Sequence, residues 1–225
     1  MAKKNKPTEK KLQVISFHSR CGGVGKSTNA LALAKQMSAK GRQVCVIDLD
    51  VIGAGLMPLL TDSAFRENLA QNTVAFLEQY MLAADTKDFD LSDLIVPYQS
   101  FSVILQLRSV NLENTKINIR VRRRAGGTPQ KLLAKKPLIK LSGNLSDGFN
   151  MLISNEKCWR EITVRLNALL KGLAEKGFDS VIIDCHTGVW LIAESLMRMA
   201  ADRQRDWKLV WINQRPPENT DRRVA

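Results

Sequence analysis

Short apolar runs alternate with helix-like segments over the N-terminal part of the chain. Residues 12–19 (LQVISFHS) and 44–49 (VCVIDL) are apolar runs typical of buried parallel strands. Between them, apolar residues recur at the spacing of one helix face over residues 28–37, and Gly41 follows at the position of a helix C-cap. This order predicts one βαβ unit with a right-handed crossover.

The same two patterns continue along the rest of the chain. They predict strands at residues 101–107, 137–141, 180–184 and 207–212, and helices at residues 72–84 and 158–176. Glycine and proline mark residues 51–62 as a loop, and Gly177 ends the second of these helices. A chain of 225 residues is long enough for one domain with a buried core. We therefore expect an α/β fold, with a mostly parallel twisted sheet flanked by helices.

A glycine-rich segment joins the first predicted strand to the first predicted helix. Residues 22–28 read GGVGKST. At such a turn, backbone N–H groups and the positive end of the helix dipole converge on an anion. Lys26 would reach the β- and γ-phosphates of ATP, and the Ser27 hydroxyl would bind Mg²⁺. The nucleotide-binding residues predicted from this segment are Cys21, Gly22, Gly23, Val24, Gly25, Lys26, Ser27 and Thr28.

Carboxylates follow two of the predicted strands. Asp184 closes the run SVIID and fits the position that holds Mg²⁺, through water, in phosphoryl-transfer enzymes. Asp48 and Asp50 close VCVIDLD beside the glycine-rich segment. Aspartates also end buried strands as loop or cap residues, so for Asp48 a structural role and a role in the site are both open.

These motifs resemble the deviant Walker A ATPases, the ParA/MinD group of P-loop proteins. The resemblance is specific over residues 12–56 and 155–200, where DLDVIGAGL and GFDSVIIDCHTG are similar to segments of a ParA-like subgroup. It implies two catalytic residues, the phosphate lysine Lys26 and the switch I carboxylate Asp50, which orients water. It further implies that Mg²⁺ is bound by Ser27 and Asp184, and that switch II contains Gly188.

The chain departs from the family pattern at Cys21, where the family has a signature lysine before GGVGK. In the family, that lysine reaches across an ATP-bound sandwich dimer to the partner's phosphates. Arg20, one residue away, is an alternative source of this cation. Two interpretations follow: an ATPase switch that dimerises on ATP, and a nucleotide-binding module with little turnover. A P-loop kinase or ligase is a third interpretation.

The formal net charge of +12 is concentrated in two segments. Residues 1–11 hold five lysines and one glutamate, and residues 120–140 hold eight basic residues and no acid. We interpret residues 1–11 as a basic flexible tail. Residues 12–225 would form a single P-loop ATPase domain with a basic insert around residues 116–140, and this domain would end earlier than is usual in the family.

The basic insert is the candidate polyanion-binding surface. Phosphate contacts need only clustered basic side chains, which the insert supplies with Arg120, Arg122, Arg123 and Arg124. The resemblance implies nonspecific DNA binding by an ATP-bound dimer. A solvated loop, or a docking site for an acidic protein, would have the same composition.

Cysteine, histidine and asparagine positions, and the lengths of the apolar runs, bear on metal binding, nucleotide recognition and localisation. The four cysteines form no C-x-x-C pair, so the sequence suggests neither a zinc site nor an iron–sulfur site. His186 falls in the presumed switch II, where it could sense the γ-phosphate. In many relatives an asparagine after a strand reads adenine, and this resemblance makes Asn213 one candidate. Alternatively, residues 216–220 (PPENT) match an earlier strand–loop of the family and the base-recognition segment is missing. No apolar run approaches the roughly 20 residues that span a bilayer, and no signal peptide begins the chain. We therefore expect a cytoplasmic protein without membrane insertion.

Overall fold

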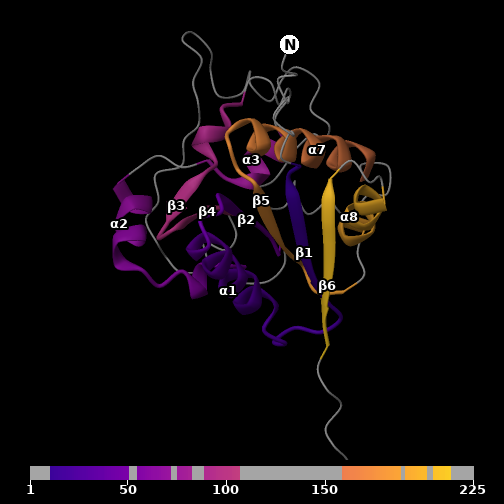
Figure 1. Ribbon diagram of the computed structural model, residues 1–225, viewed down its shortest axis with the longest axis horizontal. Helices are drawn as coiled ribbons and strands as arrows, with labels where there is room; N and C mark the ends of the chain where they lie inside the picture. The colour runs from indigo at the N-terminus through magenta and orange to yellow at the C-terminus, as the bar shows by residue number, and fades with distance from the viewer. Residues whose placement is uncertain are drawn as a thin grey trace, which may run out of the picture.

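Six strands form one sheet in the order β3-β4-β2-β5-β1-β6 (Figure 1). The structure is a computed structural model and describes residues 11–50, 55–71, 75–82, 89–106, 159–188, 191–201 and 205–213. The strands are β1 (Gln13–Ser19), β2 (Val44–Leu49), β3 (Val96–Tyr98), β4 (Phe101–Ile104), β5 (Ser180–Cys185) and β6 (Asp206–Ile212). All neighbouring pairs are parallel except β3 and β4, which are antiparallel. The predicted mostly parallel α/β sheet is confirmed.

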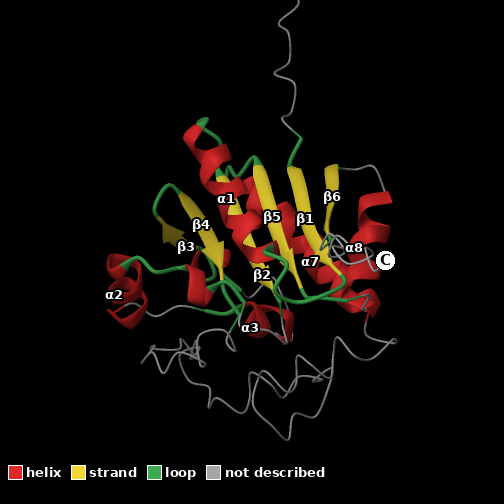
Figure 2. Cartoon of the chain, turned by 90° about the horizontal axis from the view of Figure 1, so that it is seen from below, coloured by secondary structure: helices red, strands yellow, loops and turns green. Residues whose placement is uncertain are grey.

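The central strands are apolar throughout because helices cover both faces of the sheet. Every residue of β2 and of β5 is buried. The helices are α1 (Lys26–Ala39), α2 (Ser63–Gln71), α3 (Leu77–Leu82), α7 (Trp159–Glu175) and α8 (Leu191–Ala201), with short 3-10 turns η1 (Met57–Leu59) and η3 (Leu91–Asp93). Apolar side chains of α1 and α2 pack on one face, and those of α3, α7 and α8 pack on the other. Figures 1 and 2 place α2 near the β3 edge and α8 near the β6 edge.

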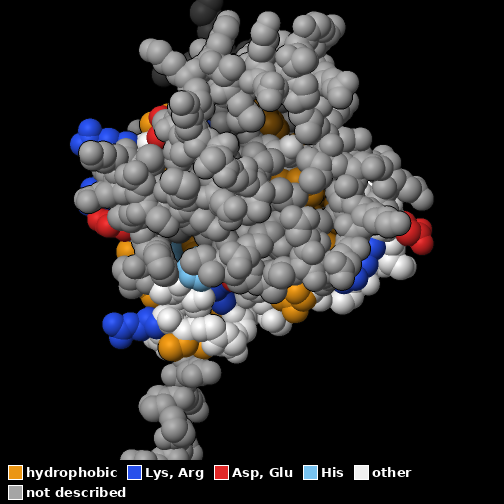
Figure 3. All heavy atoms as spheres, turned by 180° about the vertical axis from the view of Figure 1, so that it is seen from behind, with side chains coloured by type: hydrophobic (Ala, Val, Ile, Leu, Met, Phe, Trp, Pro, Cys, Tyr) orange, Lys and Arg blue, Asp and Glu red, His pale blue; other side chains and the backbone are white. Residues whose placement is uncertain are grey.

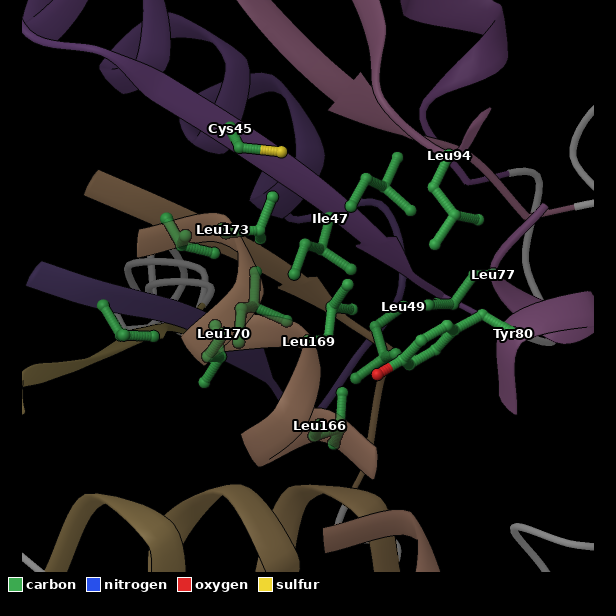
Figure 4. Close-up of a cluster of buried hydrophobic side chains, with 14 of the residues drawn as sticks. Cys45, Ile47, Leu49, Leu77, Tyr80, Leu94, Leu166, Leu169, Leu170 and Leu173 are labelled. Atoms are coloured by element: carbon green, nitrogen blue, oxygen red, sulfur yellow. The ribbon is translucent and has the colours of Figure 1, made fainter. Parts of the chain in front are cut away.

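One layer of the core lies between α7 and β2. Leu166, Leu169, Leu170 and Leu173 recur at helical spacing and are fully buried. Figure 4 shows these leucines facing the β2 side chains. The hydroxyl of Tyr80, from α3, donates a hydrogen bond of 3.3 Å to the backbone oxygen of a residue on α7. This packing matches the predicted helix at residues 158–176, and Gly177 follows its end with φ 90°.

Several elements differ from the predicted pattern. The helix predicted at residues 72–84 is confined to α3, and a separate helix, α2, precedes it. The pattern of α2 is weak because its buried apolar side chains are few, and its start is set instead by a polar contact. The Asp62 carboxylate accepts the Phe65 N–H at 3.0 Å. Strand β3 is short and contains Pro97, which is tolerated because β3 is an edge strand.

Some predicted features lie outside the described residues. They are the strand at residues 137–141, most of the basic tail and the whole basic insert. Helix α8 was not predicted, and its apolar face packs against the sheet next to α7. Within the described part of the chain, no helix is both long enough and apolar enough to cross a membrane.

Candidate nucleotide-binding site

Polar residues gather where β1, β2 and β5 end side by side. The three strands are parallel, so their carboxyl ends meet at one edge of the sheet. In the register, Asp48 on β2 lies opposite Asp184 on β5, and Asp184 lies opposite Phe17 on β1. The glycine-rich segment leaves β1 at this same edge and enters α1. Sites in open α/β sheets form at such strand ends.

The turn between β1 and α1 has the backbone of an anion-binding loop. Gly23 and Gly25 have φ values of 73° and 80°, a region that favours glycine. Gly25 caps α1 in the left-handed conformation and supplies no side-chain hydrogen bond to the helix. The first N–H groups of α1 therefore have no side-chain cap and are oriented toward the turn. The Asn29 amide donates to the Gly25 carbonyl at 2.7 Å, which ties the turn to the first turn of the helix.

Lys26 extends from this turn to the carboxylates at the strand ends. Its Nζ lies 2.7 Å from Asp184 Oδ1 and 3.9 Å from Asp50 Oδ2, and its side chain is only 6% exposed. Burial raises the pKa of the Asp184 carboxyl, and the adjacent Lys26 ammonium opposes that shift. An ammonium held among carboxylates is poised to exchange them for phosphate oxygens, because both are anionic oxygen acceptors.

The predicted Mg²⁺ ligands lie close together. Asp184 Oδ2 is buried and accepts no hydrogen bond from the described part of the chain. The nearby Ser27 hydroxyl lowers the pKa of the same carboxyl group, against the effect of burial. The described residues contain no group of three or more His, Cys, Asp or Glu side chains arranged to hold a metal. Mg²⁺ commonly takes one or two protein oxygens and completes its shell with water and phosphate, so Ser27 and Asp184 fit it.

Asp48 has a structural role that the sequence left open. Its Oδ1 accepts the Asp50 N–H at 3.2 Å and the Gln106 side-chain amide at 3.0 Å, and its Oδ2 accepts the Leu56 N–H at 2.9 Å. The carboxylate thus binds both ends of the loop that follows β2. Gly55 has φ 61°, and a Cβ there would overlap the Asp48 carboxylate. Burial is the largest cause of an increase in the pKa of Asp48 to about 8.

Sequence reasoning missed Gln106, which lies just beyond β4. Besides its contact with Asp48, its amide donates to the backbone oxygen of Asp50. The sequence does show a polar residue at the end of an apolar run here, as it does at the ends of β2 and β5. However, no sequence motif identifies Gln106 as a residue of the site.

His186 contacts Asp50 across the site. Its Nδ1 lies 2.7 Å from Asp50 Oδ1, and the two side chains are 12% and 14% exposed. Figure 3 shows histidine side-chain atoms at the surface, next to Lys or Arg side chains. Gly188, the predicted switch II glycine, donates its N–H to the Ser19 carbonyl at 2.8 Å. The segment after β5 is therefore joined by hydrogen bonds to the end of β1 and to the segment after β2.

The remaining predicted residues lie at the rim. Arg20, Cys21 and Thr28 are exposed, and Val24 is half-buried. The Cys21 carbonyl accepts the Ser19 hydroxyl at 3.1 Å. Asn213 is exposed and directly follows β6, whose last residue pairs with Ser19 of β1. It therefore lies near the start of the glycine-rich turn.

Comparisons with known proteins agree with the fold. Residues 10–89 match the ParA family, described as NUBPL iron-transfer P-loop NTPase. Apo McdA of Cyanothece aligns with a TM-score of 0.51 and 16% identity, over 88% of this chain and 70% of that chain. An ATP complex of a McdA variant gives the same score and identity, over 88% and 68%. A plasmid partition protein of Borrelia burgdorferi gives 0.51 and 15%, over 95% and 84%. Among curated proteins, none is similar enough in sequence to count as a relative.

The sheet order, the glycine-rich turn and the strand-end carboxylates define a P-loop NTPase fold. The structural likenesses show that this fold is of the ParA/MinD type, and the family match over residues 10–89 agrees with it. The fold that the sequence motifs predicted is confirmed.

Proposed function

We propose that the chain binds ATP with Mg²⁺ at the turn of residues 21–28 and hydrolyses it as a ParA/MinD-type switch. The observation that carries the proposal is the position of Lys26, whose ammonium lies between Asp184 and Asp50 at the start of α1. An ATP complex of a McdA variant with the same fold supports nucleotide binding. The uncapped N-terminus of α1 supplies the backbone donors that a polyphosphate requires.

Each residue of the site has a separate role in the proposed hydrolysis of ATP. Lys26 leaves its carboxylate partners and neutralises the β- and γ-phosphates as negative charge develops there. Ser27 and Asp184 would hold Mg²⁺, which would supply positive charge to neutralise the phosphates. Asp50 orients the attacking water, because its carboxylate accepts hydrogen bonds at the edge of the site. The N–H groups of the turn hold the phosphates in position for attack.

Asp50 provides the test of this proposal. Asp50→Ala should retain ATP affinity within about threefold and lose at least about 100-fold in turnover, because a water-orienting group acts mainly in the transition state. Phosphate release and calorimetry measure the two quantities separately. Glu175→Ala, on an exposed side chain of α7, is the matched control and should behave as wild type. Equal turnover in Asp50→Ala and wild type would exclude Asp50 from the mechanism.

Cys21 bears on how fast the chain turns over. The family's signature lysine acts from the partner subunit of an ATP-bound dimer, and here the corresponding side chain is a thiol on the exposed rim. We propose that the chain dimerises on ATP and that Arg20, also exposed, supplies the cation in trans. Turnover per chain should then rise with protein concentration and fall in Arg20→Ala. A rate independent of concentration and unchanged in Arg20→Ala would favour the nucleotide-binding module with little turnover.

A polyanion is the proposed partner of the ATP-bound form. The supporting observation is the run of eight basic residues without an acid over residues 120–140. Such a segment attracts phosphate backbones of any sequence. We propose nonspecific DNA as the ligand of Arg120, Arg122, Arg123 and Arg124.

A further inference from the structure

The Asp50 carboxylate is held by a residue from the far side of the site. His186 Nδ1 lies 2.7 Å from Asp50 Oδ1, although 136 positions separate the two residues in the chain. An ionised carboxylate only accepts hydrogen bonds, so the imidazole must carry its proton on Nδ1 to make this contact. The contact joins the segment after β2 to the segment after β5.

The backbone of Asp50 is fixed independently of its side chain. Its N–H donates to Asp48 Oδ1 at 3.2 Å, and its carbonyl accepts the Gln106 amide. The remaining freedom of Asp50 is rotation of the carboxylate. One oxygen, Oδ2, faces Lys26 at 3.9 Å, and the other, Oδ1, faces His186. Lys26 and His186 therefore contact different oxygens of this carboxylate.

His186 is itself well anchored. It follows Cys185, which pairs with Leu49 in the sheet. Two residues later, the Gly188 N–H donates to the Ser19 carbonyl at 2.8 Å. Lys26 has a competing role at the phosphates in the proposed function, whereas His186 lies after β5, outside the glycine-rich turn of residues 22–28. His186 is thus the partner able to keep Asp50 oriented after Lys26 has moved to ATP.

We propose that His186 is the positioning residue for Asp50: it donates its Nδ1–H to Oδ1 and leaves Oδ2 directed toward the attacking water. This inference rests on the proposed ATPase function. His186 acts through Asp50 and does not itself touch the reacting atoms. Its loss should reduce turnover without weakening ATP binding, since a misplacement of about 1 Å in a catalytic group can cost about 100-fold in rate.

Three substitutions of His186 in the full chain test the proposal. Asn places an amide N–H near the position of Nδ1, Gln places it one bond farther out, and Ala removes the donor. We expect His186→Ala and His186→Gln to lower kcat about 10-fold to 100-fold with KM for ATP nearly unchanged, and His186→Asn to keep most of the wild-type kcat. Wild-type kcat in His186→Ala, or equal losses in all three variants, would overturn the proposal.

A double variant separates positioning from a general structural effect. In the Asp50→Ala background, His186→Ala should cause no further loss of turnover, because the carboxylate that His186 positions is gone. Thermal unfolding of each single variant checks that the fold is retained. Independent, multiplicative losses would show that His186 acts elsewhere, and would overturn the proposal.

The hydrogen bond between His186 and Asp50 can also be tested without measuring turnover. This test distinguishes an error in the proposed ATPase function from an error in the proposed role of His186. Nitrogen-15 spectra of the imidazoles in nucleotide-free protein report which ring nitrogen carries the proton. The His186 signal, assigned by its absence in His186→Ala, should show a protonated Nδ1 that changes in Asp50→Ala. An Nδ1 without a proton, or a signal unaffected by Asp50→Ala, would overturn the positioning role even in an active enzyme. Inactivity of the wild type with the expected signals would refute the ATPase function alone.

Discussion

Asp48 illustrates how a single buried carboxylate can organise a loop. It accepts hydrogen bonds from the N–H groups of Asp50 and Leu56 and from the Gln106 amide, and it is fully buried. Burial disfavours the charged form strongly enough to raise its pKa to about 8, although the hydrogen bonds from Leu56 and Asp50 oppose this shift. Asp48 is therefore a residue whose protonation differs between the folded and unfolded chain.

Asp48 should make the folding stability depend on pH. The unfolded carboxyl has its ordinary pKa of 3.8 and the folded one about 8, so between these values the native state binds more protons than the unfolded state. Stability contributed by Asp48 is complete below pH 3.8 and is lost as pH rises toward 8, by at most about 1.4 kcal/mol per pH unit. Asp48→Asn cannot titrate. The unfolding free energy of wild type minus that of Asp48→Asn should therefore fall as pH rises from 5 to 8.

Chemical denaturation at several pH values measures this difference. Burial, with a smaller effect of Lys26, lowers the pKa of His18 to about 4, which gives a stability loss as pH falls from 6.5. That contribution is present in both proteins and cancels in the comparison. Asp48→Asn also loses an acceptor for one N–H donor, which shifts its stability at every pH but leaves the slope unaffected. A difference that is constant between pH 5 and 8 would show that Asp48 is ionised throughout.

At the scale of elements, the loop after β2 closes on the Asp48 carboxylate at Gly55. An Ala there would meet two obstacles, a φ of 61° and overlap with Asp48. Gly41, after α1, has φ 79° and nothing within 4 Å of an added Cβ, so Gly41→Ala is a matched control for the backbone strain alone. Gly41→Ala should cost about 1 kcal/mol, and Gly55→Ala clearly more than that.

Gly55→Ala should also lower ATP turnover, because displacing Asp48 displaces Asp50, whose N–H it accepts. Gly41→Ala should leave turnover unchanged. Denaturant titrations and phosphate release give the two comparisons. Equal stability losses in the two variants would mean that the loop does not depend on a close approach of Gly55 to Asp48.

The sequence predicts the elements whose local pattern and packing agree. Strand β2 was predicted at its observed bounds because a strand buried on both faces is apolar at every position. Helix α7 was predicted nearly to the residue because its leucine stripe meets the sheet directly. By contrast, β3 is a three-residue edge strand held by pairing with β4, and α2 buries few apolar side chains. Such elements depend on contacts that a local pattern does not encode.

The candidate site was only partly predictable for the same reason. Lys26, Ser27 and the strand-end aspartates follow from motifs with a local chemical meaning. The contact between His186 and Asp50, and the tie from Gln106 to Asp48, join segments 58 or more positions apart. Their partners are set by strand order in the sheet, which places β2 between β4 and β5. A sequence pattern alone specifies neither pairing.

At the scale of the whole molecule, the excess charge lies in residues 1–11 and 120–140, almost all of them outside the described residues. If Arg122, Arg123 and Arg124 contact DNA phosphates, replacing all three with Ala should weaken binding to every DNA sequence equally. Each lost contact should reduce the slope of log affinity against log salt by roughly 0.9. ATP affinity should be unchanged. A mobility assay at several salt concentrations, with ATP, measures the slope, and a wild-type slope in the triple variant would exclude this surface.

The central claim is that the turn after β1 binds ATP through Lys26. Calorimetric titration of MgATP into the wild-type chain and into Lys26→Ala tests it most directly. Lys171→Ala is the matched control, since that lysine is 76% exposed on α7. Lys26→Ala should abolish measurable binding, because it removes the side-chain cation that the turn directs to the β- and γ-phosphates, and Lys171→Ala should bind as wild type. Equal affinity in Lys26→Ala and wild type, or no binding by either, would contradict the account.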